Sequence, residues 1–312
     1  MFKISIIIPN FNGKELLKKN LPKVLLAADY WGGKYEIIVV DDASKDDSVN
    51  FLKITYPQIK LITHKSNKKF ALSCNNGVSQ SKGEIVILLN TDVIPYKNFL
   101  KPLLLDFKEK NVFAIGCREE ARINGEKVFS GRATGVFKRG FLVHKRAKNQ
   151  DKKTTLWVAT GSAAYRKNIW EKLGGLDLLY KPAYMEDIDI SYRAQKAGYK
   201  VLFEPQSLVF HQHETTNIKS MGKKGIKLAA LKNQFIFVWK NITDIELLIS
   251  HFIWLPYHLI FDTIKTKGLF ALAFVKSVAQ LPAVLKSRQK AKKLFKLSDK
   301  EILANSKCAS EL

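Results

Sequence analysis

Three short clusters of polar side chains in the first third of the chain could form a shared ligand-binding site. The clusters are Asn10 with Asn12, Asp41 with Asp42, and Asn90-Thr91-Asp92. Carboxylate oxygens are ligands that Mg²⁺ and Mn²⁺ prefer, and both ions also bind phosphate oxygens. A single carboxylate after an apolar segment is usually a turn residue or a helix cap. Three such clusters at similar positions instead favour a shared ligand site.

A further acidic cluster, Glu186-Asp187, begins a helical segment that runs to about residue 196. A carboxylate can remove the proton from an attacking hydroxyl, which makes Asp187 a candidate general base. The helix N-terminus favours the ionised form of Asp187, so burial or a like charge such as that of Glu186 must raise its pKa for efficient proton transfer. The alternative is that both residues only cap the helix.

The three polar clusters follow segments with the length and composition of buried strands. Strands are expected at 4–8, 36–40, 59–63 and 84–89, with helices between them at 14–28, 44–52 and 71–79. This alternation predicts right-handed crossovers and a parallel sheet. Because ligands bind beyond the carboxyl ends of the strands in such α/β folds, the clusters should lie close together.

The middle of the chain, from 117 to 153, is irregular and basic, and its glycines include Gly131, Gly135 and Gly140. This composition indicates either antiparallel excursions from the sheet or a flexible loop that covers a substrate. Two further strands are expected at 199–203 and 207–210, and His211 follows the second of them.

Composition describes a folded and strongly basic chain. Of its 312 residues, 46% are hydrophobic and 26% charged, which fits a globular protein better than a disordered one, and the formal net charge is +24. That charge favours an anionic partner, although solvated basic surfaces are the simpler alternative. Three widely spaced cysteines indicate reduced thiols in the cytoplasm. No signal peptide is expected, because strand-like residues begin at position 4.

The C-terminal part, 219–312, differs from the α/β part, 1–218, and is expected to be a helical extension. A basic amphipathic helix at 222–239 precedes two apolar stretches, 245–264 and 268–285, that polar residues and prolines interrupt. Interfacial helices fit these stretches better than full membrane spans. Six basic residues between 286 and 296 would be attracted to the anionic inner face of a cell membrane. The alternative is an appendage that packs on the main domain or on another subunit of an oligomer.

Six motifs, in this order, resemble those of the family-two glycosyltransferases, whose fold is called GT-A. They are SIIIPNFNG at 5–13, VVDDASKD at 39–46, NKKFALSCNNG at 67–77, LLNTD at 88–92, GGLD at 174–177 and MEDID at 185–189. Each motif alone is weak, but the ordered set is specific. The resemblance covers about residues 3 to 213 and is strongest to the rhamnosyltransferase-like branch.

The resemblance implies an inverting enzyme that transfers a sugar from a nucleotide-sugar donor to a hydroxyl acceptor, in cell-surface glycan or lipid-linked saccharide synthesis. It implies Mg²⁺ or Mn²⁺ bound by Asp92 and His211, with His213 a weaker candidate, and Asp187 as the base beside Glu186. For His211, the alternative is a strand-end histidine satisfied by hydrogen bonds. The expected nucleotide-binding residues are Pro9, Asn10, Phe11, Asn12, Asp41, Asp42, Lys69, Asn75, Asn90 and Thr91.

Two positions depart from the family pattern. Only the last residue of Asn90-Thr91-Asp92 is a carboxylate, which would weaken metal binding, and Lys69 stands where the family commonly has glycine. Lys69 could contact a phosphate or the base, or could be a solvated surface lysine.

Two other classes of protein are weighed against this one. A nucleotidyltransferase would need a glycine-rich basic loop after the first strand, but residues 9–16 hold one glycine and one lysine. A nucleic-acid-binding protein would interleave its basic residues with aromatic ones, yet the run from 286 to 296 holds only Phe295. We therefore expect a peripheral enzyme of the cytoplasmic membrane face that binds no nucleic acid.

Overall fold

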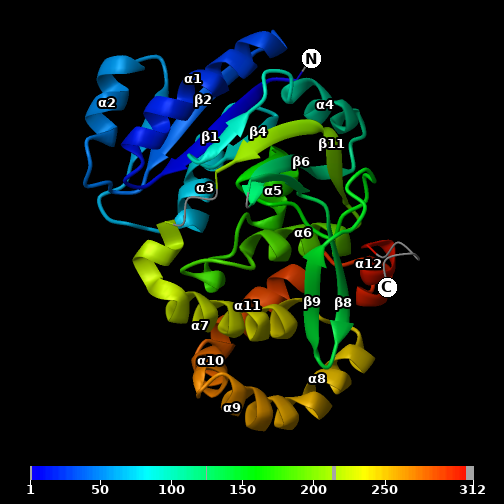
Figure 1. Ribbon diagram of the computed structural model, residues 1–312. Coiled ribbons are helices and arrows are strands. Elements are labelled where there is room, and N and C mark those ends of the chain that lie inside the picture. Colours follow the sequence, from blue (N-terminus) through cyan, green and yellow to red (C-terminus); the bar gives the residue numbers. More distant parts are fainter. Residues whose placement is uncertain (1, 124, 213–215, 307–312) are drawn as a thin grey trace.

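The computed structural model describes residues 2–123, 125–212 and 216–306. Its central sheet begins with four parallel strands in the order β3-β2-β1-β4 (Figure 1). They are β1 (Ile4–Asn10), β2 (Tyr35–Asp41), β3 (Lys60–Thr63) and β4 (Ile85–Leu89). Helices cover both faces of these strands, which explains why β1, β2 and β4 read as almost continuous apolar runs. The parallel arrangement predicted for this half is confirmed.

The second half of the sheet is mixed, so the mainly parallel sheet expected also contains antiparallel strands. Strand β10 (Ser162–Arg166) is antiparallel to both β4 and β6 (Val112–Ile123). The long excursion between β6 and β10 returns without a crossover helix, so nothing forces the parallel direction. The segments expected as two strands near 199–210 form a single strand, β11 (Lys200–His211), with an irregularity between Glu204 and Leu208. The remaining strands are β5 (Val93–Pro95), which pairs with β11, and β7 (Glu126–Ser130), which pairs with β6.

Helices pack on the two faces of the sheet in separate apolar clusters. One cluster joins the sheet to α1 (Lys14–Trp31), α2 (Ser48–Thr55) and α4 (Leu100–Leu105), which η1 (Asp106–Lys108) follows. The other cluster joins it to α3 (Phe70–Ser79), α5 (Lys167–Leu173) and α6 (Glu186–Lys196). Helix α6 packs in this second cluster, and its first residues lie near those that follow β1 and β4.

The irregular region at 117–153 forms antiparallel strands rather than a flexible loop. Besides the β6–β7 pair, it contains the hairpin of β8 (Ala133–Lys138) and β9 (Phe141–Arg146). This hairpin extends from the sheet toward α8 (Ile245–Tyr257), as Figure 1 shows. At its tip, the carbonyl of Gly140 accepts a hydrogen bond from His251 Nδ1 at 2.7 Å.

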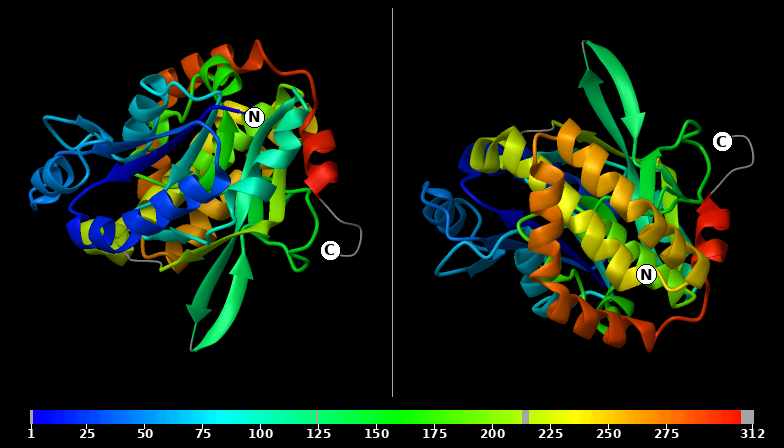
Figure 2. Two further views of the ribbon diagram at one scale, coloured as in Figure 1. Left: turned by 90° about the horizontal axis from the view of Figure 1, so that it is seen from above. Right: turned by 90° about the horizontal axis from the view of Figure 1, so that it is seen from below.

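The C-terminal helices pack on the α/β part (Figure 2). Their contacts form a third apolar cluster, which also contains residues of α6, the β8–β9 hairpin and η2 (Leu178–Tyr180). The helices are α7 (Thr216–Asn241), α8, the π-helical turn η3 (His258–Asp262), α9 (Thr263–Lys265), α10 (Leu269–Val278), α11 (Leu281–Lys292) and α12 (Asp299–Ser306). The expected division at 218/219 falls within α7. By length and composition, Ile245–Lys265 could cross a membrane, and only 11% of its most apolar window is buried.

Candidate active site

A cleft of about 530 Å³ lies beyond the carboxyl ends of β1 and β4 and beside the N-terminus of α6. Most of the residues predicted from sequence line it: Pro9, Asn10, Phe11, Asp42, Lys69, Asn90, Thr91, Asp92, Glu186, Asp187 and His211. Three predicted residues, Asn12, Asp41 and Asn75, lie outside its lining. His213 lies outside the described residues. Side chains that are far apart in the sequence, such as Asp92 and Asp187, therefore meet at one concave surface.

The Asp42 carboxylate joins three segments at one end of the cleft. It accepts hydrogen bonds from the backbone N–H groups of Lys68 and Lys69 at 2.7 and 2.8 Å, and His64 Nδ1 lies 2.7 Å from its Oδ1. Asn76 Nδ2 lies 2.8 Å from His64 Nε2, so the imidazole donates through Nδ1 to Asp42. His64, which sequence reasoning missed, therefore fixes the orientation of Asp42.

Lys69 has backbone angles that strongly favour glycine. Its φ is 74° and its ψ 164°, a region that costs other residues on the order of 1–3 kcal/mol. The hydrogen bond from its N–H to Asp42 holds the backbone there, at the residue before α3. The family preference for glycine at this position thus has a backbone cause, and the lysine side chain lines the cleft despite it.

The three predicted residues outside the cleft hold the surrounding loops. Asp41 Oδ2 accepts hydrogen bonds from Asn10 Nδ2 and the Ser44 hydroxyl, at 2.8 and 2.6 Å. Asn12 Oδ1 accepts one from the N–H of Lys45 at 2.7 Å, which joins the loops after β1 and β2. Asn75 exchanges two hydrogen bonds with the backbone of Leu176.

The segment Asn90-Thr91-Asp92 is fixed by its neighbours. The Asn90 N–H donates to the carbonyl of Gly161 at 2.9 Å, and a Cβ atom at Gly161 would lie 2.4 Å from Asn90 Nδ2. Glycine is therefore required for this close approach. Asn20 of α1 donates its side-chain N–H to the carbonyl of Thr91 at 2.7 Å. These contacts direct Asp92 toward the end of β11.

Asp92, His211 and Glu119 form one polar group on the cleft wall. His211 Nε2 lies 3.5 Å from Asp92 Oδ2, and His211 Nδ1 lies 3.2 Å from Glu119 Oε2. Burial by itself lowers the pKa of His211, but the two carboxylates outweigh it and raise the pKa to about 10. The Ser162 hydroxyl donates to the other oxygen of Glu119 at 2.5 Å. Sequence reasoning missed Glu119, because it lies inside strand β6 with no motif around it.

This group suits a divalent cation that also binds a phosphorylated ligand. Binding of a cation would displace a proton from His211, whose pKa the two carboxylates raise, and a carboxylate oxygen and a neutral imidazole nitrogen are donors that Mn²⁺ accepts readily. Within the described residues, no group of three or more histidine, cysteine, aspartate or glutamate side chains could hold a metal ion by itself. Asp92 and His211 therefore fit a cation that takes its remaining ligands from water and from the bound substrate.

Glu186 and Asp187 form the opposite side of the cleft at the start of α6 and are called here the catalytic pair, after the role predicted for them from the sequence. Burial and the neighbouring charge of Asp187 raise the pKa of Glu186 to about 8, and its Oε2 has no hydrogen-bond partner among the described residues. Burial, with a contribution from Glu119, raises the pKa of Asp187 to about 6. Asp187 is thus poised to accept a proton near neutral pH.

The backbone before the catalytic pair is strained. Tyr184 and Met185 both have positive φ angles, 74° and 75°, although neither is glycine. Ala183 and Tyr184 line the cleft on this side. Strained residues persist only where the surrounding structure fixes them, and they cluster at functional sites.

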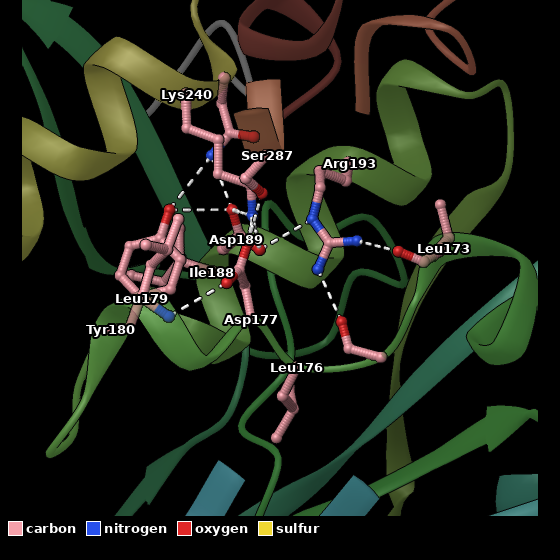
Figure 3. A network of polar contacts seen from close by, with 12 residues as sticks. Leu173, Leu176, Asp177, Leu179, Tyr180, Ile188, Asp189, Arg193, Lys240 and Ser287 are labelled. Atoms are coloured by element: carbon pink, nitrogen blue, oxygen red, sulfur yellow. Dashed lines mark hydrogen bonds and ion pairs between the residues drawn. The ribbon is translucent and has the colours of Figure 1, made fainter. Parts of the chain in front are cut away.

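Asp189, two residues after the catalytic pair, lies in a buried network on the other side of α6 (Figure 3). Its carboxylate contacts Arg193 Nε at 2.7 Å, Lys240 Nζ at 2.8 Å and Asn241 Nδ2 at 2.8 Å. Burial alone would raise the pKa of Asp189, but Arg193 and Lys240 hold it well below its usual range. Lys240 also pairs with Asp177 at 2.7 Å. This network joins α6 to α7, so it supports the site without lining it.

Comparison with known proteins identifies the family. Residues 5–174 match the family model described as glycosyl transferase family 2. The chain is 26% identical to the probable glycosyltransferase YdaM of Bacillus subtilis over 69% of this chain and 51% of YdaM. It is 27% identical to the O-antigen chain rhamnosyltransferase WbaN of Salmonella anatum over 58% of each chain. The chain thus spans about half the length of the relatives it matches.

A solved structure, GalNAc-T7 with UDP, GalNAc and Mn²⁺, has the same fold, with a TM-score of 0.61 and 20% identity over 77% of this chain and 48% of that one. This likeness confirms the GT-A fold expected from the motifs, and the family match gives no support to a nucleotidyltransferase or a nucleic-acid-binding protein. Because the family model covers more than half of the chain, the protein belongs to glycosyl transferase family 2.

Proposed function

We propose that this protein transfers a sugar from a nucleoside-diphosphate sugar to an acceptor hydroxyl, with inversion at the anomeric carbon. The observation that carries the proposal is the placement of Asp92 and His211 in the same cleft as the catalytic pair. Transfer needs a group that neutralises the leaving diphosphate and a base that activates the hydroxyl. A single displacement between two such sites inverts the sugar.

The donor nucleotide would bind at the end of the cleft that Pro9, Phe11 and Asp42 line. Pro9 and Phe11 offer apolar contacts for the base. Asn10 Oδ1 is buried with no hydrogen-bond partner among the described residues and could accept from the base or ribose. Lys69 would place its ammonium group on the diphosphate. Asp41, Asn12 and Asn75 would not contact the nucleotide but would fix the loops that surround it.

A divalent cation, Mn²⁺ or Mg²⁺, would be held by Asp92 and His211 and would neutralise charge on the diphosphate leaving group. Asp187 would accept the proton of the acceptor hydroxyl as it attacks the sugar. Glu186 has a raised pKa and would be protonated at neutral pH. It would therefore carry no charge that repels the ionised Asp187. Proton acceptance by Asp187 and charge neutralisation by the cation would then act on opposite sides of the sugar.

The acceptor would be a cell-surface glycan precursor or a lipid-linked saccharide at the inner face of the membrane. The outer surface of 245–265 supports this proposal, since Ile245, Ile253 and Ile264 are 71%, 69% and 72% exposed. His251 and His258, on the opposite face of the same segment, are buried in the third apolar cluster. Exposed Lys265 and Lys267 adjoin the apolar surface, as expected for helices that lie in an anionic interface.

Donor binding can be tested by the shift in thermal unfolding with UDP, GDP, dTDP or CDP, each with and without Mn²⁺. We expect one diphosphate to stabilise the protein only when Mn²⁺ is present, and we expect EDTA to abolish transfer from the matching nucleotide sugar. NMR of the product should show the inverted anomer. A retained anomer, or transfer that EDTA leaves unchanged, would contradict the mechanism.

Membrane association can be tested by flotation with vesicles. We expect binding to phosphatidylglycerol vesicles and little binding to phosphatidylcholine vesicles. Changing Ile253 and Ile264 together to glutamate should abolish binding without unfolding the protein, because both side chains already face outward. If this double variant binds vesicles normally but changes from dimer to monomer, the surface is a subunit contact instead.

A further inference from the structure

Helix α7 of the C-terminal extension contacts the loop that carries the catalytic pair. Asn233 Nδ2 lies 2.8 Å from the carbonyl of Tyr180, 2.9 Å from that of Ala183 and 2.8 Å from that of Tyr184. Lys232 Nζ donates to the carbonyl of Lys181 at 2.8 Å. Two adjacent side chains of one helix therefore donate to four carbonyls between Tyr180 and Tyr184, and the two N–H groups of Asn233 are shared among three of them.

This loop needs external support, because its own backbone does not stabilise its shape. Tyr184 and Met185 have left-handed backbone angles, and Met185 is the residue before the first turn of α6. Buried carbonyls require hydrogen-bond donors, and here α7 supplies them. Asn233 is completely buried and does not line the cleft, so it cannot touch a substrate bound there.

The same helix also holds the chain on the other side of the catalytic pair. Lys240 and Asn241, two turns after Asn233, bind the carboxylate of Asp189. Helix α7 is thus attached to the backbone immediately before Glu186 and to the side chain two residues after Asp187. Any displacement of α7 would move the base relative to Asp92, in the turn between β4 and β5, and to His211, at the end of β11.

We infer that Asn233 and Lys232 are positioning residues, which fix loop 181–185 so that Glu186 and Asp187 face the cleft. The C-terminal extension is then part of the catalytic apparatus and not only an attachment to the membrane. The inference rests on the proposed glycosyl transfer for its kinetic consequences, but its structural consequence can be measured without any substrate.

The test compares Asn233→Ala with the wild-type protein by hydrogen–deuterium exchange and by kinetics. In the ligand-free protein, exchange of peptides covering 180–188 should accelerate about tenfold or more, while peptides of β1 and β2 keep their rates. The turnover number at saturating substrates should fall by about 10- to 100-fold, because the base is misplaced, and the donor KM should change little. The acid limb of the kcat profile should move to lower pH as Asp187 becomes more exposed to water.

Tyr192→Phe is the matched control. Tyr192 is a buried residue of α6 whose hydroxyl donates to Asp299 at 2.8 Å, away from the cleft. This variant should lose stability but keep wild-type exchange at 180–188 and wild-type kcat. Normal loop exchange with normal kcat in Asn233→Ala would overturn the inference, and so would equal effects of the two variants.

If Asn233→Ala does not fold, Lys232→Met replaces it, because methionine preserves a straight apolar side chain at a buried position. We expect faster exchange at 180–188 and a lower kcat, both by smaller factors than in Asn233→Ala. A folded Lys232→Met protein with wild-type exchange and kcat would overturn the inference. A failure of the proposed function is distinguishable: the wild-type protein would then show no glycosyl transfer, or transfer that Asp187→Asn leaves unchanged. Loop exchange in the α7 variants would still test the role of Asn233 and Lys232.

Discussion

Helix α6 carries carboxylates of opposite character within one turn. On the cleft side, Glu186 and Asp187 have raised pKa values and few partners, and strained residues precede them. On the other side, Asp189 is completely buried, is bound by Arg193, Lys240 and Asn241, and has a pKa well below its usual range. Both groups are acidic residues of a single helix, so their surroundings and not their type decide what they do.

The comparison separates carboxylates that stabilise the folded protein from carboxylates that lower its stability but are suited to accept a proton. A buried carboxylate with charged partners stabilises the folded protein only as long as every partner is present. A buried carboxylate without partners lowers the stability of the ionised folded state but is a stronger base than an ordinary aspartate. The following predictions test this contrast, from the largest expected effect to the smallest.

Replacing Asp187 by asparagine should abolish most of the transfer activity. The variant keeps the size of the side chain but cannot accept a proton, so kcat should fall by about 10²- to 10⁴-fold. The stability of the folded protein at pH 8 should not decrease. Steady-state rates and urea unfolding of the same preparation measure both quantities. Unchanged transfer would show that the base lies elsewhere.

Replacing Asp189 by asparagine should have the opposite effect, mainly on stability. Lys240 and Arg193 would lose a buried partner, and we expect a loss of about 3–5 kcal/mol in the free energy of unfolding. Asp47→Asn is the control, since Asp47 forms an exposed ion pair with Lys14 that solvent screens, and its loss should change stability little. Similar losses in the two variants, measured by urea unfolding, would contradict the contrast.

The two sides of α6 should also differ in how pH changes stability. The folded-state pKa of Glu186 is raised from 4.5 to about 8, so its stabilising effect is complete at low pH and is lost as the pH rises through 8. Glu186→Gln should therefore be more stable than the wild type above pH 8, by about 1–3 kcal/mol, and equally stable near pH 4. Unfolding free energies measured from pH 4 to 9 check this.

For Asp189→Asn, the unfolding free energy relative to the wild type should depend on pH in the opposite direction. The folded-state pKa of Asp189 is lowered, so its stabilising effect is present above the unfolded-state pKa and is lost as the pH falls. The difference between this variant and the wild type should then shrink in acid and grow toward neutral pH. Curves that run in parallel for Glu186→Gln and Asp189→Asn would refute the assignment.

Replacing Lys69 by glycine tests whether the strained backbone at this position is kept because the lysine side chain binds the nucleoside diphosphate. Glycine adopts a φ of 74° without a steric penalty, so the variant should gain about 1 kcal/mol in unfolding free energy. If Lys69 contacts the diphosphate, affinity for the preferred nucleoside diphosphate with Mn²⁺ should fall about tenfold, as calorimetry would show. A stability gain with full affinity would make Lys69 a surface lysine at a strained position.

Much of the α/β part could be predicted from the sequence, because local patterns determine it. The runs that became β1, β2 and β4 are apolar throughout, and their polar ends are clear in the sequence. The antiparallel direction of β10 could not be predicted, since strand direction depends on how the chain returns after β6. The motif residues of the cleft could also be predicted, because they directly follow these apolar runs in the sequence.

Residues that act by long-range contact left no local signal. Glu119 reaches His211 only because β6 and β11 are neighbours in the sheet. Asn233 and Lys240 lie on a helix whose sequence reads as basic and amphipathic, yet both are buried. Tyr184 and Met185 carry side chains that give no hint of positive φ angles. Each of these features depends on tertiary contacts that a local reading of the sequence does not contain.

The central claim is that donor, cation and base meet in one cleft, with Asp92 and His211 on one side and Asp187 on the other. Anomalous scattering from Mn²⁺ in crystals grown with the preferred nucleoside diphosphate tests it most directly. We expect a peak within about 2.0–2.3 Å of Asp92 and His211 that also touches the diphosphate, with the Asp187 carboxylate facing the same space. A diphosphate bound away from Asp92, or a manganese ion that contacts neither residue, would contradict the account.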